Sequence, residues 1–585
     1  MTHIALEDRP SQPLLRATLE AQGLPGVLAD CLARRGVASI DELDTALIRL
    51  HPPHALTNAP EAAASLGRAI QGGASILIVG DYDADGATAT AVMVRGLRRF
   101  GATVDFLVPD RFAFGYGLTP ALVEHARKTF SPLPDWLITV DNGVSSHAGV
   151  AAAQALGMEV LVTDHHLPGR TLPQTRILNP QLPNCTFPSK HLAGVGVAFY
   201  LIMALRGWLA QQQHFKGDAP RIDDLLPLVA LGTVADLVTL DANNRRLVAQ
   251  GLQRIRKGIM PPGLAALFET AARPIGQASA SDLGFSIGPR LNAAGRLSDM
   301  SIGIRCLITD NDQEAFSLAQ SLDALNRSRR EVEGQNRDEA LAQLAALPDV
   351  QDRKGLVLFD AGWHQGVVGL IASRLKDKAH RPTIVFAPDQ NGDGLKGSGR
   401  SIPGVHLRDV LERVDSQHPG LIRAFGGHAM AAGLSIDRAS LADFEAAFEA
   451  AVEAFSTPEH FSRSLLTDGE LAPEHHTVVV AETLTTVVWG QGFAPPLFRG
   501  RFVIREQRLL KQAHLKMSIS PVGSPAHRFD AIWFNGPDHL PPEAELAYGL
   551  AINEWQGSRR IQLLVSGTCQ ARAWLEPGTC LTPWR

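Results

Sequence analysis

The feature that most constrains the fold is a series of four apolar runs in the first third of the chain. They are rich in Val, Ile and Leu, alternate with stretches of helical character, and cover residues 75–80, 102–109, 136–141 and 158–164. Continuous apolar strands separated by amphipathic segments are typical of a parallel sheet whose two faces are buried by helices. We therefore expect an α/β fold, in which ligands bind beyond the carboxyl ends of the strands.

Three of the four runs lead directly into acidic residues. The first is followed by Asp81-Tyr82-Asp83-Ala84-Asp85-Gly86, the third ends at Asp141, and the fourth ends at Asp164, before His165 and His166. Crowded carboxylates repel one another unless cations hold them together. A calcium loop of the EF-hand type is a poor alternative, because Val92 stands where such a loop needs a glutamate.

Asp236 lies inside an otherwise apolar run, residues 228–238. An unpaired carboxylate there would carry a large desolvation cost, so Asp236 is either a hydrogen-bonded structural residue or a further metal ligand. Together with the acidic turns and the histidines it offers enough oxygen and nitrogen ligands for two divalent ions such as manganese. Two ions about 3.5–4 Å apart suit the attack of water on a phosphate, so phosphoester hydrolysis is the indicated reaction.

Composition bounds the class of protein. The 585 residues allow about four domains, and 45% hydrophobic with 20% charged residues is ordinary globular usage. The five cysteines are scattered and include no CxxC pair, which favours a reducing cytoplasm. We see no leader with a basic start and an apolar stretch, and no run of about 18 apolar residues, so we expect a protein outside the membrane. The net charge of −5 means that nucleic-acid binding must come from a local patch or a metal site.

Five segments are expected along the chain: a helical lead-in (1–50), the catalytic α/β domain (51–310), a connecting helix (311–347), a second α/β domain (348–456) and a small β-barrel (457–585). The barrel is expected to include short strands at 476–489, 501–510 and 560–567. His475 and His476 lack acidic neighbours beyond Glu474, so we expect a solvated pair there.

The motifs DYDADG (81–86), DNG (141–143), DHH (164–166) and GTVAD (232–236) resemble, in order and spacing, those of the DHH phosphoesterase superfamily. The later segments GPRLNAAGRL (288–297), GSGRS (397–401) and FGGHAMAAG (425–433) resemble its RecJ branch of single-strand-specific 5′ to 3′ DNA exonucleases. The resemblance runs from about residue 50 to the C-terminus. It implies two divalent cations, Mn²⁺ or Mg²⁺, as cofactors.

The resemblance also implies roles for the acidic and histidine residues. The candidate metal ligands are Asp81, Asp83, Asp85, Asp141, His165 and Asp236. Asp141 would bridge the ions, Asp164 would orient the adjacent histidine or support the ligands from behind, and His166 would face the scissile phosphate. Related pyrophosphatases have a histidine where this chain has Val79, so whether Asp81 or Asp83 binds directly stays open.

Substrate-binding residues are implied in both α/β domains. In the second domain, which binds substrate across a cleft in this family, the candidates are Ser398, Arg400, Gly427 and His428. Glycines let backbone N–H groups approach a phosphate and an arginine can grip it with two hydrogen bonds, although a glycine-rich packing turn is the alternative. In the first domain Arg290, Asn292 and Arg296 would contact the DNA backbone, and Arg111 is either a 5′-phosphate ligand or a surface ion-pair residue.

The segment 489–516 resembles the OB-fold domain of the same branch. OB folds hold single strands with basic groups along the phosphates and aromatic rings against the bases. The candidate single-strand surface is Phe498, Arg499, Arg501, Phe502, Arg505 and Arg508. The alternative is that the two phenylalanines form the barrel core and the charges a solvated face.

We therefore predict a metal-dependent 5′ to 3′ exonuclease on single-stranded DNA that releases 5′-mononucleotides in recombination and repair. The resemblance implies work beside single-strand-binding protein and a RecQ-type helicase. One alternative is a DHH-type phosphodiesterase of short oligonucleotides or small nucleotides, against which the OB-like domain argues. The other is a non-catalytic single-strand DNA-binding scaffold, against which the complete set of motif carboxylates argues.

Overall fold

The computed structural model describes residues 4–110, 114–347, 350, 352–389, 394–555 and 557–569. The chain forms two compact units. The catalytic unit contains Asp41–Glu331 and Val488–Ala494, and the barrel unit contains Met1–Ile40, Val332–Val487 and Pro495–Arg585.

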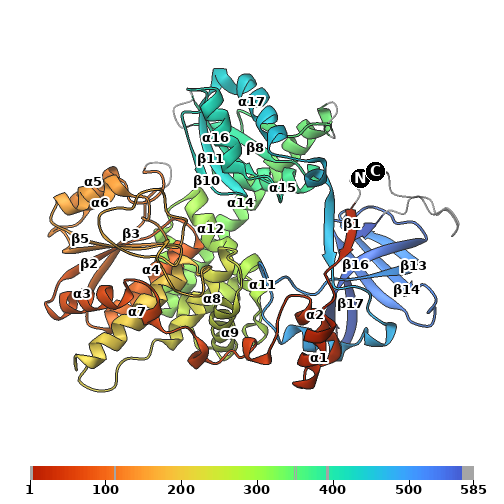
Figure 1. The fold of residues 1–585 in the computed structure, drawn as a ribbon, viewed down its shortest axis with the longest axis horizontal. Helices are drawn as coiled ribbons and strands as arrows, with labels where there is room; N and C mark the ends of the chain where they lie inside the picture. The colour runs from red at the N-terminus through yellow and green to blue at the C-terminus, as the bar shows by residue number, and fades with distance from the viewer. Residues whose placement is uncertain are drawn as a thin grey trace. The chain divides into compact units, whose positions relative to one another are not determined.

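The catalytic unit is built on the predicted parallel sheet (Figure 1). Its five strands lie in the order β3-β2-β4-β5-β6 and all pair in parallel. Their bounds are β2 (Ser75–Val79), β3 (Thr103–Leu107), β4 (Trp136–Val140), β5 (Glu159–Thr163) and β6 (Arg176–Leu178). The carboxyl ends of β2, β4 and β5 therefore deliver the predicted acidic residues to one edge.

Helices cover both faces of this sheet. On one side lie α3 (Ala59–Gln71), α4 (Ala84–Arg99) and α7 (Gly194–Gln211), and on the other α5 (Pro120–Thr129) and α6 (His147–Ala155) (Figure 1). Helix α7 is long and apolar enough to cross a membrane, but 61% of its length is buried inside the protein, where it packs against α3 and α4. It is a core helix.

The remaining helices of the catalytic unit follow in sequence. They are α8 (Leu226–Ala235), α9 (Ala242–Arg256), α10 (Pro262–Thr270), α11 (Ala280–Asp282), a π-helical turn (Leu283–Ile287), α12 (Gly288–Leu297) and α13 (Ser301–Ile308). The predicted connecting helix follows as α14 (Asp312–Ala346), with Ala319 and Leu322 fully buried. Phe316, three residues before Ala319 in the same helix, is 36% exposed.

The second α/β fold lies in the barrel unit. Its sheet has the order β10-β11-β9-β8-β7, in which β7 and β8 are parallel and the other pairs antiparallel. The strands are β7 (Leu356–Phe359), β8 (Thr383–Pro388), β9 (Gly394–Arg400), β10 (Ala424–Gly427) and β11 (Ala431–Asp437). One core involves α16 (Leu407–Gln417) and α17 (Leu441–Ala454), and the other involves the end of α14 with α15 (Val368–Ala379).

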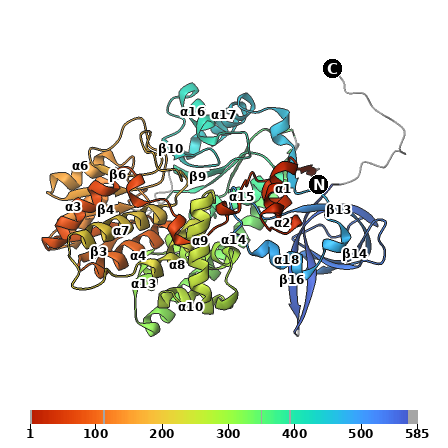
Figure 2. The same cartoon turned by 60° about the horizontal axis from the view of Figure 1, so that its bottom comes forward.

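The C-terminal barrel is closed, with the strand order β13-β14-β15-β17-β16. Its strands are β13 (Phe498–Leu510), β14 (His514–Pro521), β15 (Phe529–Phe534), β16 (Glu543–Trp555) and β17 (Ser558–Cys569). The expected strand at 476–489 was wrong, because these residues form α18 (Val478–Thr485), which packs against β16 and β17 (Figure 2). The side chain of Thr477 accepts a hydrogen bond from the Val480 N–H and so starts a helix, despite the β-branched residues.

The N-terminal lead-in contains α1 (Pro13–Ala21) and α2 (Gly26–Ala33), and also a strand that was not expected. Strand β1 (Ile4–Asp8) pairs in parallel with β12 (Arg463–Thr467). The buried guanidinium of Arg35 on the lead-in binds both carboxylate oxygens of Asp468, at 2.6 and 2.9 Å. The first forty residues are therefore a structural part of the barrel unit.

The prediction of a solvated histidine pair was correct for His475, which is exposed, and wrong for His476, which is 6% exposed. The His476 ring stacks on Phe529, and its Nε2 lies 2.7 Å from the Tyr548 hydroxyl. His476 is a core residue of the barrel.

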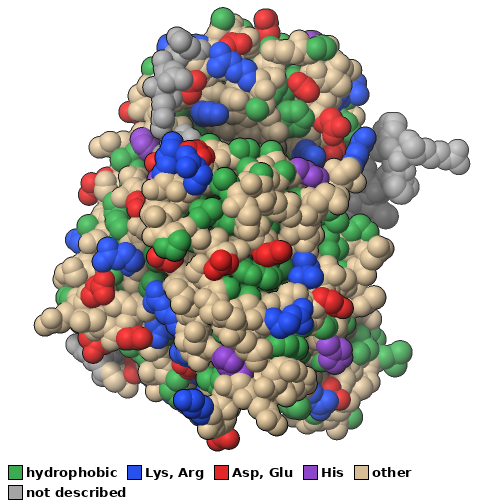
Figure 3. Space-filling model, turned by 90° about the vertical axis from the view of Figure 1, so that its left-hand side faces the viewer, with side chains coloured by type: hydrophobic (Ala, Val, Ile, Leu, Met, Phe, Trp, Pro, Cys, Tyr) green, Lys and Arg blue, Asp and Glu red, His purple; other side chains and the backbone are tan. Residues whose placement is uncertain are grey.

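The face of the molecule drawn in Figure 3 carries a mixed surface charge. Figure 3 shows acidic and basic side chains interspersed, with apolar side chains between them. This agrees with the small net charge of the chain and leaves nucleic-acid binding to local groups.

Candidate metal centre and nucleic-acid interface

The turn between β2 and α4 carries the first three carboxylates. Asp83 is the N-cap of α4, and its side chain accepts a hydrogen bond from the Gly86 N–H at 3.0 Å. Asp85, one residue into the helix, is buried, and its two oxygens accept hydrogen bonds from Gly194 N and Val195 N at 2.6 and 2.9 Å. The amino-terminal end of α7 therefore fixes the Asp85 carboxylate.

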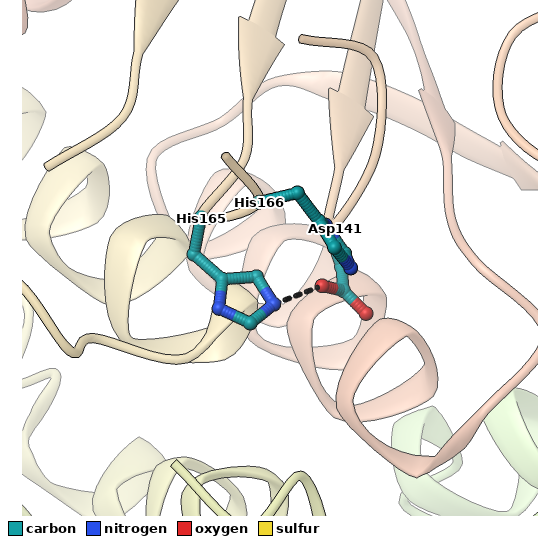
Figure 4. Close-up of side chains that lie close together, drawn as sticks. All are labelled: Asp141, His165 and His166. Carbon is teal, nitrogen blue, oxygen red and sulfur yellow. Dashed lines mark ion pairs between the residues drawn. The ribbon is translucent and has the colours of Figure 1, made fainter. Parts of the chain in front are cut away.

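Asp141 follows β4 with a left-handed backbone, φ 63°. Its side chain is buried, and its Oδ1 lies 3.1 Å from His165 Nε2 (Figure 4). A Cβ atom at Gly194 would lie 2.6 Å from Asp141 Oδ1, so the lack of a side chain lets α7 approach this carboxylate. Asp141 Oδ1 accepts no hydrogen bond from the described residues.

His165 links the remaining ligand candidates. Its Nε2 lies 3.6 Å from Asp236 Oδ2 and 3.9 Å from Asp85 Oδ2. Asp236 reaches this point because it is the C-cap residue of α8. The sequence motifs therefore meet although they lie up to 155 residues apart, from Asp81 to Asp236.

All six predicted ligands fall into groups that could hold a metal ion. The groups, each with ligand atoms within 4.8 Å of one another, are Asp81, Asp83 and Asp141; Asp85, His165 and Asp236; and Asp141, His165 and His166. Asp141 belongs to two groups, which fits the bridging role that the family resemblance implies.

The electrostatics of the cluster suit divalent cations. Burial, followed by the charges of neighbouring carboxylates, raises the pKa of Asp85 to about 7 and raises the pKa values of Asp141 and Asp236 well above the ordinary range. Carboxylates so placed resist ionisation unless positive charge compensates them. Mn²⁺ binds both carboxylate oxygens and imidazole nitrogens, whereas Mg²⁺ prefers oxygen ligands. The carboxylates of the cluster therefore suit both ions, and the imidazoles suit Mn²⁺.

Asp164 and His166 form a separate pair beside the cluster. Asp164 Oδ1 lies 2.7 Å from His166 Nδ1 and also accepts the backbone N–H groups of both histidines. Burial alone would raise the pKa of Asp164, but the hydrogen bond from His166, the charges of both histidines and the Val144 N–H together outweigh it, and the pKa is lowered. The Asp164 carboxylate thus contacts the ring of His166, whereas from the adjacent His165 it accepts only the backbone N–H, and its role in orienting a histidine stays a prediction.

Tyr116 is a site residue that the sequence analysis missed. Its hydroxyl lies 3.2 Å from both ring nitrogens of His166, and its ring meets Tyr82 edge to face at 6.3 Å. Half of Tyr116 is exposed. The sequence signal for it was weak, because a lone tyrosine in a glycine-rich loop is common.

The residues of the catalytic unit that were predicted to contact the DNA backbone have different environments in the structure. Asn292 Oδ1 accepts the Ala84 N–H at 2.7 Å, so it supports the acidic turn, and Arg296 is partly buried on the same helix. Arg290 is 8% exposed and binds Asp323 and the Ser286 carbonyl, which ties α12 to α14. This burial does not favour a DNA contact by Arg290. Arg111 lies outside the described residues.

In the second α/β fold the predicted residues lie on β9 and at the end of β10, and the start of α15 packs against those of β9. Arg400 Nη1 binds Ser398 Oγ at 3.1 Å, and burial lowers the pKa of Arg400. A Cβ atom at Gly369, in the first turn of α15, would lie 2.9 Å from Ser398 Oγ and 3.0 Å from Arg400 Nη2. A helix N-terminus beside a guanidinium and a hydroxyl is suited to an anion.

Gly427 and His428 form the end of the β10–β11 hairpin. Gly427 has φ 148°, and the His428 N–H donates to the Ala431 carbonyl at 2.8 Å. The glycine-rich segment is therefore partly a packing turn, and its role toward substrate stays a prediction.

In the barrel, three of the predicted single-strand residues are placed differently. Phe498 and Phe502 are 3% and 2% exposed and pack against Tyr548, so they are core residues and cannot stack on bases. Arg499 binds both oxygens of Asp8 and one of Glu545, so it anchors β1. The predicted stacking by the phenylalanines was wrong because residues four apart on a strand share one face, here the inner one.

The outer face of β13 carries the other candidates. Arg501, Arg505 and Arg508 are exposed. Arg508 pairs in register with Lys516 on β14, and two residues along, His514 pairs with Phe534 on β15. Phe534 is 56% exposed and meets the His514 ring at 5.2 Å. Phe534 on β15 is therefore an exposed aromatic ring of the barrel that the sequence analysis did not select.

Parallel-sheet geometry, six converging ligand candidates and the order of the motifs define a DHH-type phosphoesterase. The chain matches the models of the DHH family N-terminal domain at residues 75–233, the DHHA1 domain at 352–456 and the RecJ OB domain at 467–567.

It is 48% identical over 556 residues to the single-stranded-DNA-specific exonuclease RecJ of Escherichia coli (strain K12), over 93% of this chain and 95% of that protein. It is 34% identical over 528 residues to the Thermus thermophilus protein of the same name, over 89% and 72% of the two chains. A crystal structure of Thermus thermophilus RecJ in complex with Mn²⁺ matches 99% of this chain and 81% of its own, with TM-score 0.81 and 31% identity. The chain belongs to the RecJ family.

Proposed function

We propose that the protein is a metal-dependent exonuclease that degrades single-stranded DNA from its 5′ end and releases 5′-mononucleotides. The observation that carries this proposal is the convergence of the six ligand candidates at one edge of the parallel sheet. The exonuclease names of the relatives, and the Mn²⁺ and Mg²⁺ in the titles of two related crystal structures, support it.

Two bound divalent ions would supply an activated water and positive charge on the phosphoryl oxygens. The residues that would hold them are Asp81, Asp83, Asp85, Asp141, His165 and Asp236. Asp85 is preorganised by the N–H groups of Gly194 and Val195, which limits the movement of its carboxylate.

His166 would face the scissile phosphate. Burial disfavours a charged ring, but the hydrogen bond with Asp164 and the negative charges of Asp164, Asp236 and Asp81 together raise the pKa of His166 to about 9. A protonated imidazole can donate a hydrogen bond to a phosphoryl oxygen. Tyr116 lies against the same ring and limits its rotation.

We propose a division of labour among the predicted domains, with catalysis in 51–310, phosphate binding in 348–456 and single-strand binding in 457–585. The anion-suited place beside Arg400 supports the second role. The exposed Arg508 and Phe534 and the partly exposed Lys516 on the barrel support the third, because basic groups and an exposed ring can hold a single strand without reading its sequence.

Family membership further supports action in recombination and repair, in the cytoplasm, beside single-strand-binding protein and a RecQ-type helicase. Affinity capture of the tagged full chain with each purified partner tests these contacts, and loss of capture in high salt only would indicate non-specific charge attraction.

The Asp141→Ala variant tests the site. It should lose hydrolysis of a 5′-phosphorylated single strand yet still bind it in Mn²⁺-free buffer, because the basic surfaces are intact. Asp135→Ala is the matched control, since Asp135 precedes the same strand at its opposite end and lies away from the cluster. Full activity of Asp141→Ala would contradict the assignment.

The same experiment distinguishes the alternatives. A phosphodiesterase of short oligonucleotides would cleave dinucleotides faster than long strands. A DNA-binding scaffold would show no hydrolysis in the unaltered protein.

A further inference from the structure

A short segment from the C-terminal third of the chain packs onto the catalytic unit. This segment, Trp489–Phe493, is called the turn segment here. Its neighbours in sequence, α18 and β13, belong to the barrel unit, whereas the turn segment groups with the catalytic unit. Gly490 and Phe493 pair through two backbone hydrogen bonds, N to O at 2.9 and 3.1 Å, so the segment is a compact turn.

The turn segment contacts the loop that follows Asp236. This loop, Leu237–Asp241, is called the Asp236 loop. The Leu240 N–H donates to the Gln491 carbonyl at 2.8 Å. A Cβ atom at Gly490 would lie 2.6 Å from Leu240 Cδ1, and one at Gly492, where φ is 70°, would lie 2.5 Å from Thr239 Cγ2. At Gly492 both the positive φ and the close contact favour glycine, whereas a side chain at Gly490 would displace the side chain of Leu240.

Arg245 joins the same two parts. Its guanidinium lies 4.1 Å from the centre of the Phe493 ring, and its Nη1 donates to the Leu240 carbonyl at 2.9 Å. Phe493 and Arg245 are 5% and 8% exposed, and the Trp489 ring stacks on the Phe493 ring at 5.1 Å. A cation is attracted to the face of an aromatic ring, and burial strengthens this attraction, so Arg245 holds Phe493 against the Asp236 loop.

The first residue of the Asp236 loop needs outside support. Leu237 has a left-handed backbone, φ 60°, and its side chain is 65% exposed. A non-glycine residue in this region is strained, so surrounding contacts must hold it there. In this structure the loop is held at Leu240 by the turn segment and Arg245, and at Thr239 by Asn244, whose side chain donates to the Thr239 carbonyl at 2.9 Å.

We propose that the turn segment is a positioning element for the metal centre, which fixes the Asp236 loop so that the Asp236 carboxylate stays within reach of His165 and Asp85. Phe493 and Gly492 are its positioning residues. This inference rests on the proposed role of Asp236 as a metal ligand. It means that a segment outside the four motif regions of the catalytic sheet contributes to metal affinity.

Mn²⁺ titration of the full chain without DNA, followed by calorimetry, tests the inference. Phe493→Ala should weaken Mn²⁺ binding on the order of tenfold, the lower end of what loss of support behind a metal ligand costs. Phe493→Leu keeps apolar volume but loses the ring beneath Arg245, so it should weaken binding less while keeping the protein folded. Phe529→Ala is the matched control, because Phe529 is also buried but lies in the barrel.

Asp236→Ala separates the two claims. If Asp236→Ala leaves Mn²⁺ binding unchanged, the ligand assignment fails. If Asp236→Ala weakens binding but Phe493→Ala and Phe493→Leu behave like Phe529→Ala, the positioning role of the turn segment is overturned and the ligand assignment stands.

Discussion

The two adjacent histidines after β5 have different neighbours and hence different tasks. His165 Nε2 faces Asp141, Asp236 and Asp85, whereas His166 Nδ1 is held by Asp164. The motif order predicted both histidines at this edge, because parallel strands end together. The two rings take separate orientations because Asp164 accepts two backbone N–H groups. This hydrogen bonding could not be predicted from the sequence pattern.

The Asp164→Asn variant should lower the hydrolysis rate about 10- to 100-fold, because an amide cannot hold His166 and both N–H groups as the carboxylate does. Mn²⁺ stoichiometry should stay unchanged, since Asp164 belongs to no ligand group. Rates with saturating Mn²⁺ measure the effect, with Asp135→Asn as the control. A rate equal to that of the control would show that Asp164 has no orienting role.

Single aromatic residues were the least predictable part of the site. Phe498 and Phe502 stand among arginines in the sequence yet point into the barrel, whereas Phe534, in an ordinary apolar run, is exposed. Strand alternation shows that two residues share a face, but barrel closure decides whether that face is inside. Tyr116 contacts His166 from an irregular loop, and the conformation of such a loop cannot be predicted from sequence periodicity.

At the scale of elements, the arginines of strand β13 have two different roles. Arg508→Ala should weaken single-strand binding and reduce the salt slope of log Kd by about one, as expected for one lost phosphate contact. Arg499→Ala should leave the slope unchanged and instead release β1, because Arg499 binds Asp8. Fluorescence anisotropy at several salt concentrations compares the two. Equal slopes for both variants would contradict the assignment of the outer face.

Helix α18 and its flank also illustrate the limits of local pattern. The run 476–489 is rich in Val and Thr, which favours a strand, but Thr477 caps a helix and the barrel supplies the packing. Propensity is outweighed where tertiary contacts are strong.

His476 beside α18 makes the barrel sensitive to acid. Burial lowers the pKa of His476, whose Nδ1 faces the Ala472 carbonyl and whose Nε2 faces the Tyr548 hydroxyl. Below its unfolded pKa of about 6.5 the unfolded chain binds a proton that the folded barrel resists, so stability falls as the pH decreases, by up to about 1.4 kcal/mol per pH unit. Thermal unfolding between pH 7 and 5 should show a smaller slope in His476→Gln. An equal slope would exclude His476 as the source.

At the scale of the whole molecule, residues from opposite ends of the sequence share one unit. Strand β1 pairs with β12, and the side chains of Arg35 and Asp468 are 4% and 0% exposed. The helical signals of the lead-in were readable, but the strand was not, because five residues with one short apolar pattern have no periodicity to detect.

Asp468→Ala should destabilise the barrel unit by about 3–5 kcal/mol, because it leaves the Arg35 charge buried without its partner. Mn²⁺ affinity should be unchanged, since all ligand candidates lie in the catalytic unit. Calorimetry should show an earlier unfolding transition alongside normal Mn²⁺ titration. A variant with unaltered transitions would show that the pair is not a structural anchor.

The overall α/β architecture, the connecting helix and the closed barrel were predictable because their apolar patterns are long and their order is regular. The metal centre was predictable because three of the motifs follow strands of the same sheet, and because Asp236, the C-cap residue of α8, is a carboxylate within an apolar run. The N-terminal strand, the turn segment and the inner face of β13 depend on contacts between distant residues. Those contacts form only when the chain folds, so no short stretch of the sequence predicts them.

The most direct measurement is digestion of single strands and duplexes that carry a label at the 5′ or the 3′ end, with Mn²⁺, Mg²⁺ or EDTA. The predicted result is release of the 5′ label first, as a mononucleotide, from single strands only, with no cleavage in EDTA. Release of the 3′ label first, equal cleavage of duplexes, or activity that persists in EDTA would contradict a metal-dependent 5′ exonuclease of single-stranded DNA.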